Sequence, residues 1–296
     1  MKKSVLNSPR LLELKKKKHK ILRRKIFFLI CFFILILVGL SFLSKWEYIN
    51  INNIQISGNK VIETKMIESV VKEKIAGNYL WFFPKTNFLL YPKGEIKREI
   101  ADKFKRLKDI SLNVQNFKTL NISLTERTAL YTYCGITPPE TNDSNQKCYF
   151  VDNSGYIFDE APYFSGEVYL KFYGVPDVGH LDSGRPTSES NPSGSYFFQP
   201  NFLKLISMKG TLEKIGIKPV MFFIDDTGDI KIFLSSSTSQ PGPYVILKGN
   251  ADFNQIVENL QSVLTTEPLQ TEFKTKYSSL LYIDLRFGNK VYYKFK

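Results

Sequence analysis

The longest apolar stretch of the chain covers residues 26–43, which include no charged side chain. A helix rises about 1.5 Å per residue, so a helix over this stretch is just long enough to cross the apolar core of a bilayer. We therefore predict a membrane-spanning helix over 26–44. A secretory signal has a shorter apolar core and a cleavage site of small residues, which Ser41-Phe42-Leu43-Ser44 matches poorly. An uncleaved anchor is thus favoured over a cleaved signal or a buried helix of a soluble protein.

After a short linker over 45–53, the chain shows both strand-like and helix-like periods. Alternation of apolar and polar side chains predicts half-buried strands at 54–57, 110–115 and 120–125. Apolar residues at helical spacing predict one helix over 63–75 and another that begins at Pro92. The resulting order, β-α-α-β-β, indicates a small domain over 54–134 with its helices on one face of a sheet.

The loop 135–147 is rich in Pro, Thr and Asn, and we predict that it links this domain to a β-rich domain over 148–296. We expect helices packed on an antiparallel sheet there, so the whole chain has an α+β fold. The stretch 177–200, rich in Gly, Ser and Pro, predicts a mobile loop whose role the sequence leaves open. The predicted strands cover 148–151, 156–158, 168–173, 220–224, 230–234, 244–247, 280–287 and 290–295, and the predicted helices cover 202–215 and 253–264.

The positive charge of the chain is concentrated before the apolar stretch. Residues 1–25 hold eleven Lys or Arg and one Glu, so this tail supplies +10 of the formal net charge of +13. Basic residues beside the first apolar helix keep that end in the cytoplasm, so we expect a single-pass protein of the cytoplasmic (inner) membrane with residues 45–296 outside. The tail suits anionic lipid, whereas a remaining charge of only +3 is weak support for a nucleic-acid partner.

Residue types that perform chemistry are scarce. There are two histidines: His19 lies in the basic tail, and His180 stands alone in the 177–200 loop, so zinc-binding spacings are absent. There is no nucleophile elbow and no Gly-rich phosphate loop, and the acids between Asp225 and Asp229 fit a polar turn better than a calcium loop. We expect no catalytic residue, metal or cofactor, although paired carboxylates for glycoside cleavage need only proximity in space.

The chain has three cysteines. Cys31 lies within the predicted membrane helix. Cys134 and Cys148 bracket the 135–147 loop at the ends of two predicted strands, in a compartment that can be oxidising. A disulfide between them and two separate thiols both remain open from the sequence.

Four short motifs, in order behind the basic tail and apolar stretch, resemble the FtsQ/DivIB family of bacterial cell-division proteins. The resemblance covers residues 26–296. It departs at Thr128 and Ala129, where the family usually continues Glu-Arg-x-Pro. The motifs are Ile54-Gln-Ile-Ser-Gly-Asn59, Ile122-Ser-Leu-Thr-Glu-Arg127, Cys148-Tyr-Phe-Val-Asp-Asn-Ser-Gly-Tyr-Ile-Phe158 and Tyr282-Ile-Asp-Leu-Arg-Phe287.

The resemblance implies a scaffold of the division machinery without enzymatic activity. Residues 54–134 would form a POTRA domain that serves recruitment of other division proteins. The chain would bind two small coiled-coil membrane proteins that resemble FtsB and FtsL, and would link early division proteins to septum formation. A membrane-anchored cell-wall enzyme and a POTRA component of a protein-export system are the alternatives.

The chain-terminal hairpin is the predicted binding site. We expect it at a sheet edge, where the strand 290–295 accepts an extended partner segment, although a covered edge without a partner is the alternative. Alternation places Leu281, Ile283, Leu285 and Phe287 on one face of the preceding strand. The resemblance implies that Arg286 meets an acidic residue of the FtsB-like partner and that Phe287 supplies an aromatic contact. The predicted partner-binding residues are Arg286, Phe287, Lys290, Val291, Tyr292 and Tyr293.

Overall fold

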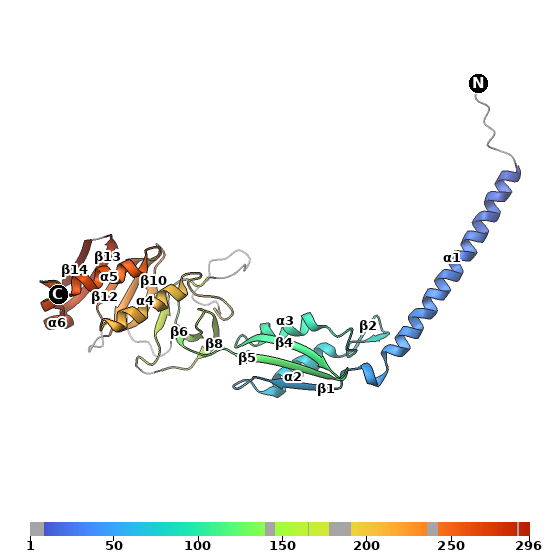
Figure 1. The fold of residues 1–296 in the computed structure, drawn as a ribbon, viewed down its shortest axis with the longest axis horizontal. Helices are drawn as coiled ribbons and strands as arrows, with labels where there is room; N and C mark the ends of the chain where they lie inside the picture. Colours follow the sequence, from blue (N-terminus) through green and yellow to red (C-terminus); the bar gives the residue numbers. More distant parts are fainter. Residues whose placement is uncertain (1–8, 140–145, 165, 178–190, 236–241, 289) are drawn as a thin grey trace, which may run out of the picture. The chain divides into compact units, whose positions relative to one another are not determined.

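The computed structural model describes residues 9–139, 146–164, 166–177, 191–235, 242–288 and 290–296. The chain divides into two compact units, a first unit of Met1–Lys103 with Asp109–Thr125 and a second unit of Phe104–Lys108 with Glu126–Lys296. Together they form a mixed α+β structure with one long N-terminal helix and a large sheet (Figure 1).

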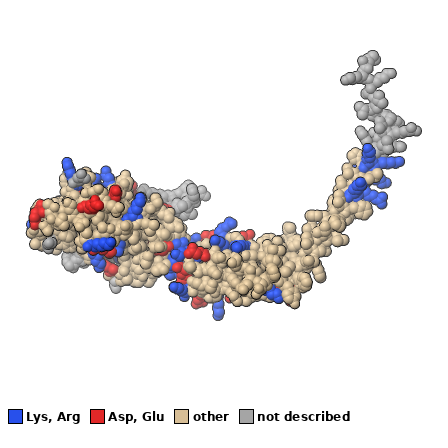
Figure 2. Space-filling view, viewed as in Figure 1, with Lys and Arg blue, Asp and Glu red and all other residues tan. Residues whose placement is uncertain are grey.

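Helix α1, Pro9–Ser44, begins before the apolar stretch and includes much of the basic tail. Its segment Lys17–Ser44 is the one helix in the described part of the chain that is long and apolar enough to cross a membrane. Figure 2 shows Lys and Arg side chains near its start, followed by an uncharged length. Large apolar side chains along this length are exposed, as a lipid-facing surface requires.

The first unit packs two helices, α2 (Thr64–Ile75) and α3 (Lys93–Lys103), with a three-stranded sheet. The sheet order is β1 (Asn53–Ser57), β5 (Thr119–Glu126) and β4 (Leu107–Gln115), and β1 runs parallel to β5. The order of helices and strands agrees with the periodicity of the sequence. Between α2 and α3 in the sequence, β2 (Asn78–Tyr79) and β3 (Phe83–Pro84) form a small hairpin. The sequence did not indicate this hairpin.

One turn of the first unit depends on glycine. Gly58 ends β1 with φ +96°, a conformation that L residues rarely adopt. A Cβ atom there would overlap the carbonyl oxygen of Leu124 on the neighbouring strand β5. Gly58 therefore lets the chain turn out of β1 while the two strands stay paired, and the core beneath them is formed by Ile67, Val71, Ile96, Ile100, Leu120 and Ile122.

The second unit contains a nine-stranded sheet in the order β14-β13-β12-β11-β10-β9-β6-β7-β8. Its helices are α4 (Phe202–Lys214), α5 (Phe253–Leu264) and α6 (Leu269–Thr275), with a short 3₁₀ turn, Tyr277–Ser279, before β13. The strands are β6 (Tyr131–Tyr133), β7 (Cys148–Val151), β8 (Ile157–Ala161), β9 (Lys171–Tyr173), β10 (Pro219–Ile224), β11 (Asp229–Leu234), β12 (Tyr244–Lys248), β13 (Leu280–Phe287) and β14 (Lys290–Phe295).

The expectation of an antiparallel sheet is wrong, because the sheet is mixed. Strand β9 runs parallel to both β6 and β10, and β12 runs parallel to β13. Parallel neighbours need a crossover connection, usually helical. Helix α4 lies between β9 and β10, and α5 and α6 lie between β12 and β13. Both α4 and α5 contribute to one core, in which the rings of Phe172 and Phe202 lie 5.3 Å apart.

The expected linker at 135–147 is also misplaced. Strand β6 pairs with β7 and β9, so it is part of the large sheet, and the boundary between the units falls at Thr125 and Glu126. The strand predicted over 168–173 is shorter, covering Lys171–Tyr173. A disulfide joins Cys134 to Cys148, just after β6 and at the start of β7.

The predicted mobile loop at 177–200 lies in large part outside the described residues, since 178–190 are not described. Contacts hold part of its described segment, 191–200, in place. Tyr196 forms isolated bridges with Tyr156 and Asp177, and the side chain of Phe197 is fully buried. Aromatic packing therefore fixes a segment whose Gly, Ser and Pro content suggested mobility.

A buried ion pair holds the first residues of the second unit. Arg127 Nη1 lies 2.5 Å from Asp152 Oδ2, and the guanidinium stacks 3.8 Å from the centre of the Tyr156 ring. The other carboxylate oxygen of Asp152 accepts hydrogen bonds from Ser154 N and Oγ and from Tyr156 N. Burial alone would raise the pKa of Asp152, but the hydrogen bonds from Ser154 and Arg127 outweigh it and lower that pKa.

We predict that Arg127→Ala lowers the unfolding free energy of the second unit by about 3 kcal/mol at neutral pH, because it leaves the buried Asp152 carboxylate without its cation. The pKa of Asp152 is lower in the folded than in the unfolded chain, so this stabilisation is present above the unfolded pKa. It is lost as pH falls through the folded pKa.

Denaturant unfolding of the full chain in detergent, repeated from neutral to acidic pH, measures this difference. The exposed Arg98→Ala is the matched control and should change stability little. An Arg127→Ala loss that stays constant into strong acid would contradict the role given to Asp152.

Candidate functional site

Strand β14 lies at one end of the nine-stranded sheet (Figure 1). Within the described residues its strand neighbour is β13, to which it pairs antiparallel, and its other side faces no strand. An edge strand of this kind offers a row of backbone N–H and C=O groups to any extended segment that lies beside it. The backbone of β14 is therefore the first feature of the site.

The direction of these backbone groups follows from one hydrogen bond. The N–H of Lys296 donates to the carbonyl oxygen of Ser279, so it points toward the β13 side. Backbone groups of successive residues point to opposite sides of a strand. Tyr292 therefore faces β13, whereas the N–H and C=O groups of Val291, Tyr293 and Phe295 face the open edge.

The side chains of β14 divide between the core and solvent. Val291, Tyr293 and Phe295 pack against the hydrophobic core. Lys290, Lys294 and Lys296 are exposed, as is Tyr292. One face of β14 thus has exposed positive charge, and the side chains of the other face pack on the hydrophobic core.

The prediction that Phe287 lies on the same face of the strand as Ile283 and Leu285 is wrong. Ile283 and Leu285 are buried, but Phe287 is 55% exposed. The pairing of β13 with β14 shifts register between Asp284 and Phe287, and such a bulge reverses the alternation beyond it. The Phe287 ring instead meets Tyr292 on β14 edge to face, with the ring centres 5.2 Å apart. These two exposed rings form an apolar spot beside the open edge.

Arg286 does not face the open edge. It lies on β13 and reaches across β12 to β11, where its Nη1 lies 2.7 Å from Asp229 Oδ2. Its Nη2 also lies 2.7 Å from Asp284 Oδ2. Asp229 lies away from β14, whereas Asp284 lies on β13 opposite Tyr292 of β14. The contact of Arg286 with a partner stays a prediction. The ion pairs with Asp229 and Asp284 were not predicted from the sequence, although the Asp-x-Arg spacing on β13 was the available signal for the second.

The Arg286 side chain favours the ionised form of the Asp284 carboxylate. Burial would raise the pKa of Asp284, but hydrogen bonds from Arg286 outweigh it and lower that pKa. The Arg286 side chain donates three hydrogen bonds of 2.7 to 3.2 Å to the Asp284 carboxylate. A pair of acids serves glycoside cleavage only when one has a raised pKa and can donate a proton. The lowered pKa of Asp284 makes this residue unsuited to that proton-donating role.

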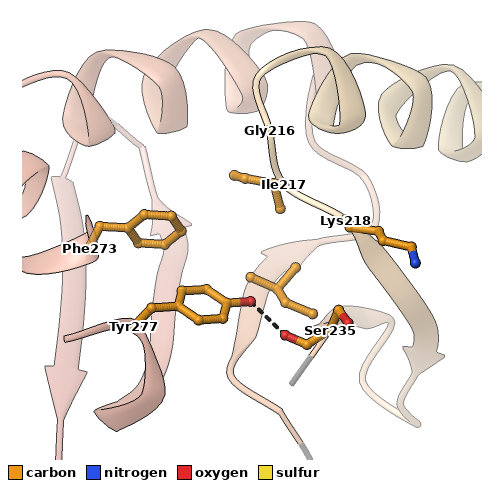
Figure 3. Close-up of a pocket in the computed structure, with 7 residues that line it drawn as sticks. Gly216, Ile217, Lys218, Ser235, Phe273 and Tyr277 are labelled. Carbon is orange, nitrogen blue, oxygen red and sulfur yellow. Dashed lines mark hydrogen bonds between the residues drawn. The ribbon is translucent and has the colours of Figure 1, made fainter. Parts of the chain in front are cut away.

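A surface pocket of about 390 Å³ lies elsewhere in the second unit (Figure 3). The rings of Phe273 and Tyr277 and the side chain of Ile217 line it, and the Tyr277 hydroxyl donates to the carbonyl oxygen of Ser235 at 2.9 Å. Among the described residues no group of three or more His, Cys, Asp or Glu side chains could hold a metal ion, and His180 lies outside them.

No family model matches the chain, and no curated protein matches it either. The function is therefore inferred from the chain's own residues. The structure brings Phe287, Lys290, Val291, Tyr292 and Tyr293 together at one sheet edge, and Arg286 forms ion pairs with Asp229 on β11 and Asp284 on β13.

We predict that Arg286→Glu destabilises the second unit by about 3 kcal/mol or more at neutral pH, because it leaves a third carboxylate beside Asp229 and the buried Asp284. The charge reversal Lys290→Glu, on the same hairpin, is the matched control and should have little effect.

The pKa of Asp284 is lower in the folded chain than in the unfolded chain, so the stabilisation that its carboxylate provides is lost as pH falls through the folded pKa. The difference in melting temperature between the parent and Arg286→Glu should therefore become smaller in acid. Thermal melting of the full chain across pH measures this. Equal melting temperatures for parent and Arg286→Glu at neutral pH would show that the network carries no stability.

Proposed function

We propose that the chain is a single-pass scaffold of the bacterial division machinery, related to the FtsQ/DivIB family, which binds FtsB- and FtsL-like coiled-coil membrane proteins by strand addition to β14. The observation that carries this proposal is the open edge of β14 at the end of the large sheet, in a chain that begins with an apolar helix.

Strand addition suits the geometry of the edge. Three residues of β14 direct backbone groups outward, and main-chain hydrogen bonds would set the register of an added segment. Phe287 and Tyr292 offer exposed aromatic area where a partner side chain can pack. Lys290, Lys294 and Lys296 favour a segment with acidic residues and oppose pairing of two β14 edges.

The first unit would serve recruitment. Its β1, α2, α3, β4, β5 order is the one expected for a POTRA domain, and the resemblance gives that domain the task of gathering other division proteins. In this arrangement α1 holds the protein in the cytoplasmic membrane with its N-terminus inside, and both units lie outside, at the division septum. The exposed strand edge, rather than a catalytic centre, would be the working surface.

Protease treatment of intact spheroplasts tests the topology. We expect residues 45–296 to be digested while the basic tail stays protected, because Lys and Arg hold the N-terminus inside. A tag at each end, detected separately, reports the two sides. Complete protection of the C-terminal tag, with digestion after the cells are broken, would overturn the proposed location.

The backbone claim is tested by a matched pair of proline variants. Val291→Pro removes an N–H that faces the open edge, and proline is tolerated on an edge strand in that position. Tyr292→Pro removes an N–H that faces β13, so it should lower the melting temperature by several degrees. We expect Val291→Pro to melt near the parent and yet to lose most of the partner.

Partner binding is measured by capturing the tagged full chain from native membranes and identifying short single-span coiled-coil proteins by mass spectrometry. The exposed Lys204→Ala, on α4, is a control that should leave capture unchanged. If Val291→Pro stays folded and captures these proteins as well as the parent does, β14 is not the binding edge.

A further inference from the structure

The turn between β2 and β3 in the first unit exposes three large apolar residues in sequence. Leu80 is 80% exposed, Trp81 is 89% exposed and Phe82 is 57% exposed. Leu80 and Trp81 both have positive φ, 47° and 69°, where two-residue hairpin turns usually have Asn and Gly. This turn is unfavourable in two ways, because its backbone is strained and its bulky apolar side chains are exposed to solvent. Such locally unfavourable features concentrate at functional sites.

Hydrogen bonds attach this turn to the end of α1. Ser41 Oγ donates to the carbonyl oxygen of Phe82 at 3.0 Å, and Asn87 Nδ2 donates to Ser44 O and Oγ at 3.3 Å. Ser41 and Ser44 are 7% and 6% exposed, unlike the apolar residues around them. Ser41 lies within one helical turn, about 5.4 Å, of the end of the apolar stretch. Figure 1 shows β2 near the C-terminal end of α1. In a bilayer spanned by α1, the β2–β3 turn would therefore lie where the membrane gives way to water.

The residues around the turn have the composition of a membrane interface. Trp46 and Tyr48 follow α1, are 61% and 64% exposed, and pack edge to face with ring centres 5.9 Å apart. Lys118 lies 4.3 Å from the centre of the Tyr48 ring, and Lys85 lies 5.4 Å from that of Tyr79. Trp and Tyr concentrate at the level of lipid headgroups, and lysines beside them suit anionic lipid.

We propose that Leu80, Trp81 and Phe82 form an interfacial anchor, which inserts into the headgroup and upper acyl region of the leaflet where α1 ends. The bilayer is the proposed occupant because the hydrogen bond from Ser41 to Phe82 attaches the exposed apolar turn to the end of the apolar helix α1. This inference rests on the proposed membrane anchoring by α1 and not on the partner site. Helix α1 would attach the first unit through the bilayer, and the turn would attach it at the bilayer surface. Together they would fix the orientation of the first unit relative to the membrane.

The two tryptophans make the test direct. Trp46 and Trp81 are the only tryptophans in the sequence, so Trp46→Phe leaves Trp81 as the single reporter. The full chain carrying Trp46→Phe is reconstituted in phosphatidylethanolamine and phosphatidylglycerol vesicles that contain lipids brominated near either the headgroup end or the methyl end of the acyl chain. We expect a blue-shifted Trp81 emission that the headgroup-end bromines quench more strongly.

Two control proteins calibrate the result, each with both native tryptophans replaced by Phe. Phe33→Trp places the reporter on the apolar part of α1 and should be quenched most by the methyl-end bromines. Val61→Trp places it on the exposed turn after β1, at the opposite end of that strand from α1, and should be unquenched.

The outcomes separate the two ideas. Quenching of the Phe33→Trp reporter without quenching of Trp81 beyond the Val61→Trp level overturns the interfacial anchor and leaves the membrane helix in place. Absence of quenching for the Phe33→Trp reporter overturns both. Partner capture through β14 is measured independently, so its failure leaves the quenching result unchanged.

Discussion

The need of every strand for hydrogen-bonded neighbours governs the second unit. A strand that is paired on one side still has unpaired N–H and C=O groups on the other side. These groups can pair with a further strand unless side chains or other segments prevent it. Here nine strands satisfy one another in turn, and the series stops at β14. Charged side chains, rather than another strand, accompany that end: Lys290, Lys294 and Lys296 are exposed along it. Lysines at an edge disfavour pairing with a second copy of the same strand, and the outer side of β14 faces no strand among the described residues.

The interior of the sheet shows how charge is handled away from that edge. Arg286 satisfies the buried Asp284 and reaches Asp229 two strands away, which ties β13 to β11 across β12. Arg127 plays a similar part for Asp152 at the beginning of the second unit. Both arginines come from motifs that carry the family resemblance, Glu-Arg and Asp-Leu-Arg. In this chain each arginine pairs with a buried aspartate and so stabilises local structure.

Sequence periodicity predicted most helices and strands, because burial of one face imposes a period on the side chains. The apolar stretch 26–43, the helix α5 and the terminal hairpin followed directly from it. Pairing direction did not, since parallel and antiparallel strands have the same alternation. The bulge that exposes Phe287 was hidden for a similar reason: one extra residue on β13 leaves no mark in the pattern. The partners of Arg286 and the Leu80–Trp81 turn depend on contacts between distant residues, or on backbone conformations, that composition does not encode.

The order of strands along the sheet has a consequence for shortened chains. From β10 to β14 the strands follow one another in space as they do in sequence, so the last strand of the described residues is also the outermost one. A stop codon before Lys290 would leave the inner strands paired and make β13 the new edge. That strand presents Leu280, Ile283 and Leu285 without a single lysine, and its arginine is already committed to two aspartates. Such a protein would lose the lysines that oppose self-pairing together with the proposed partner strand, so we expect it to aggregate rather than only to lose partner binding.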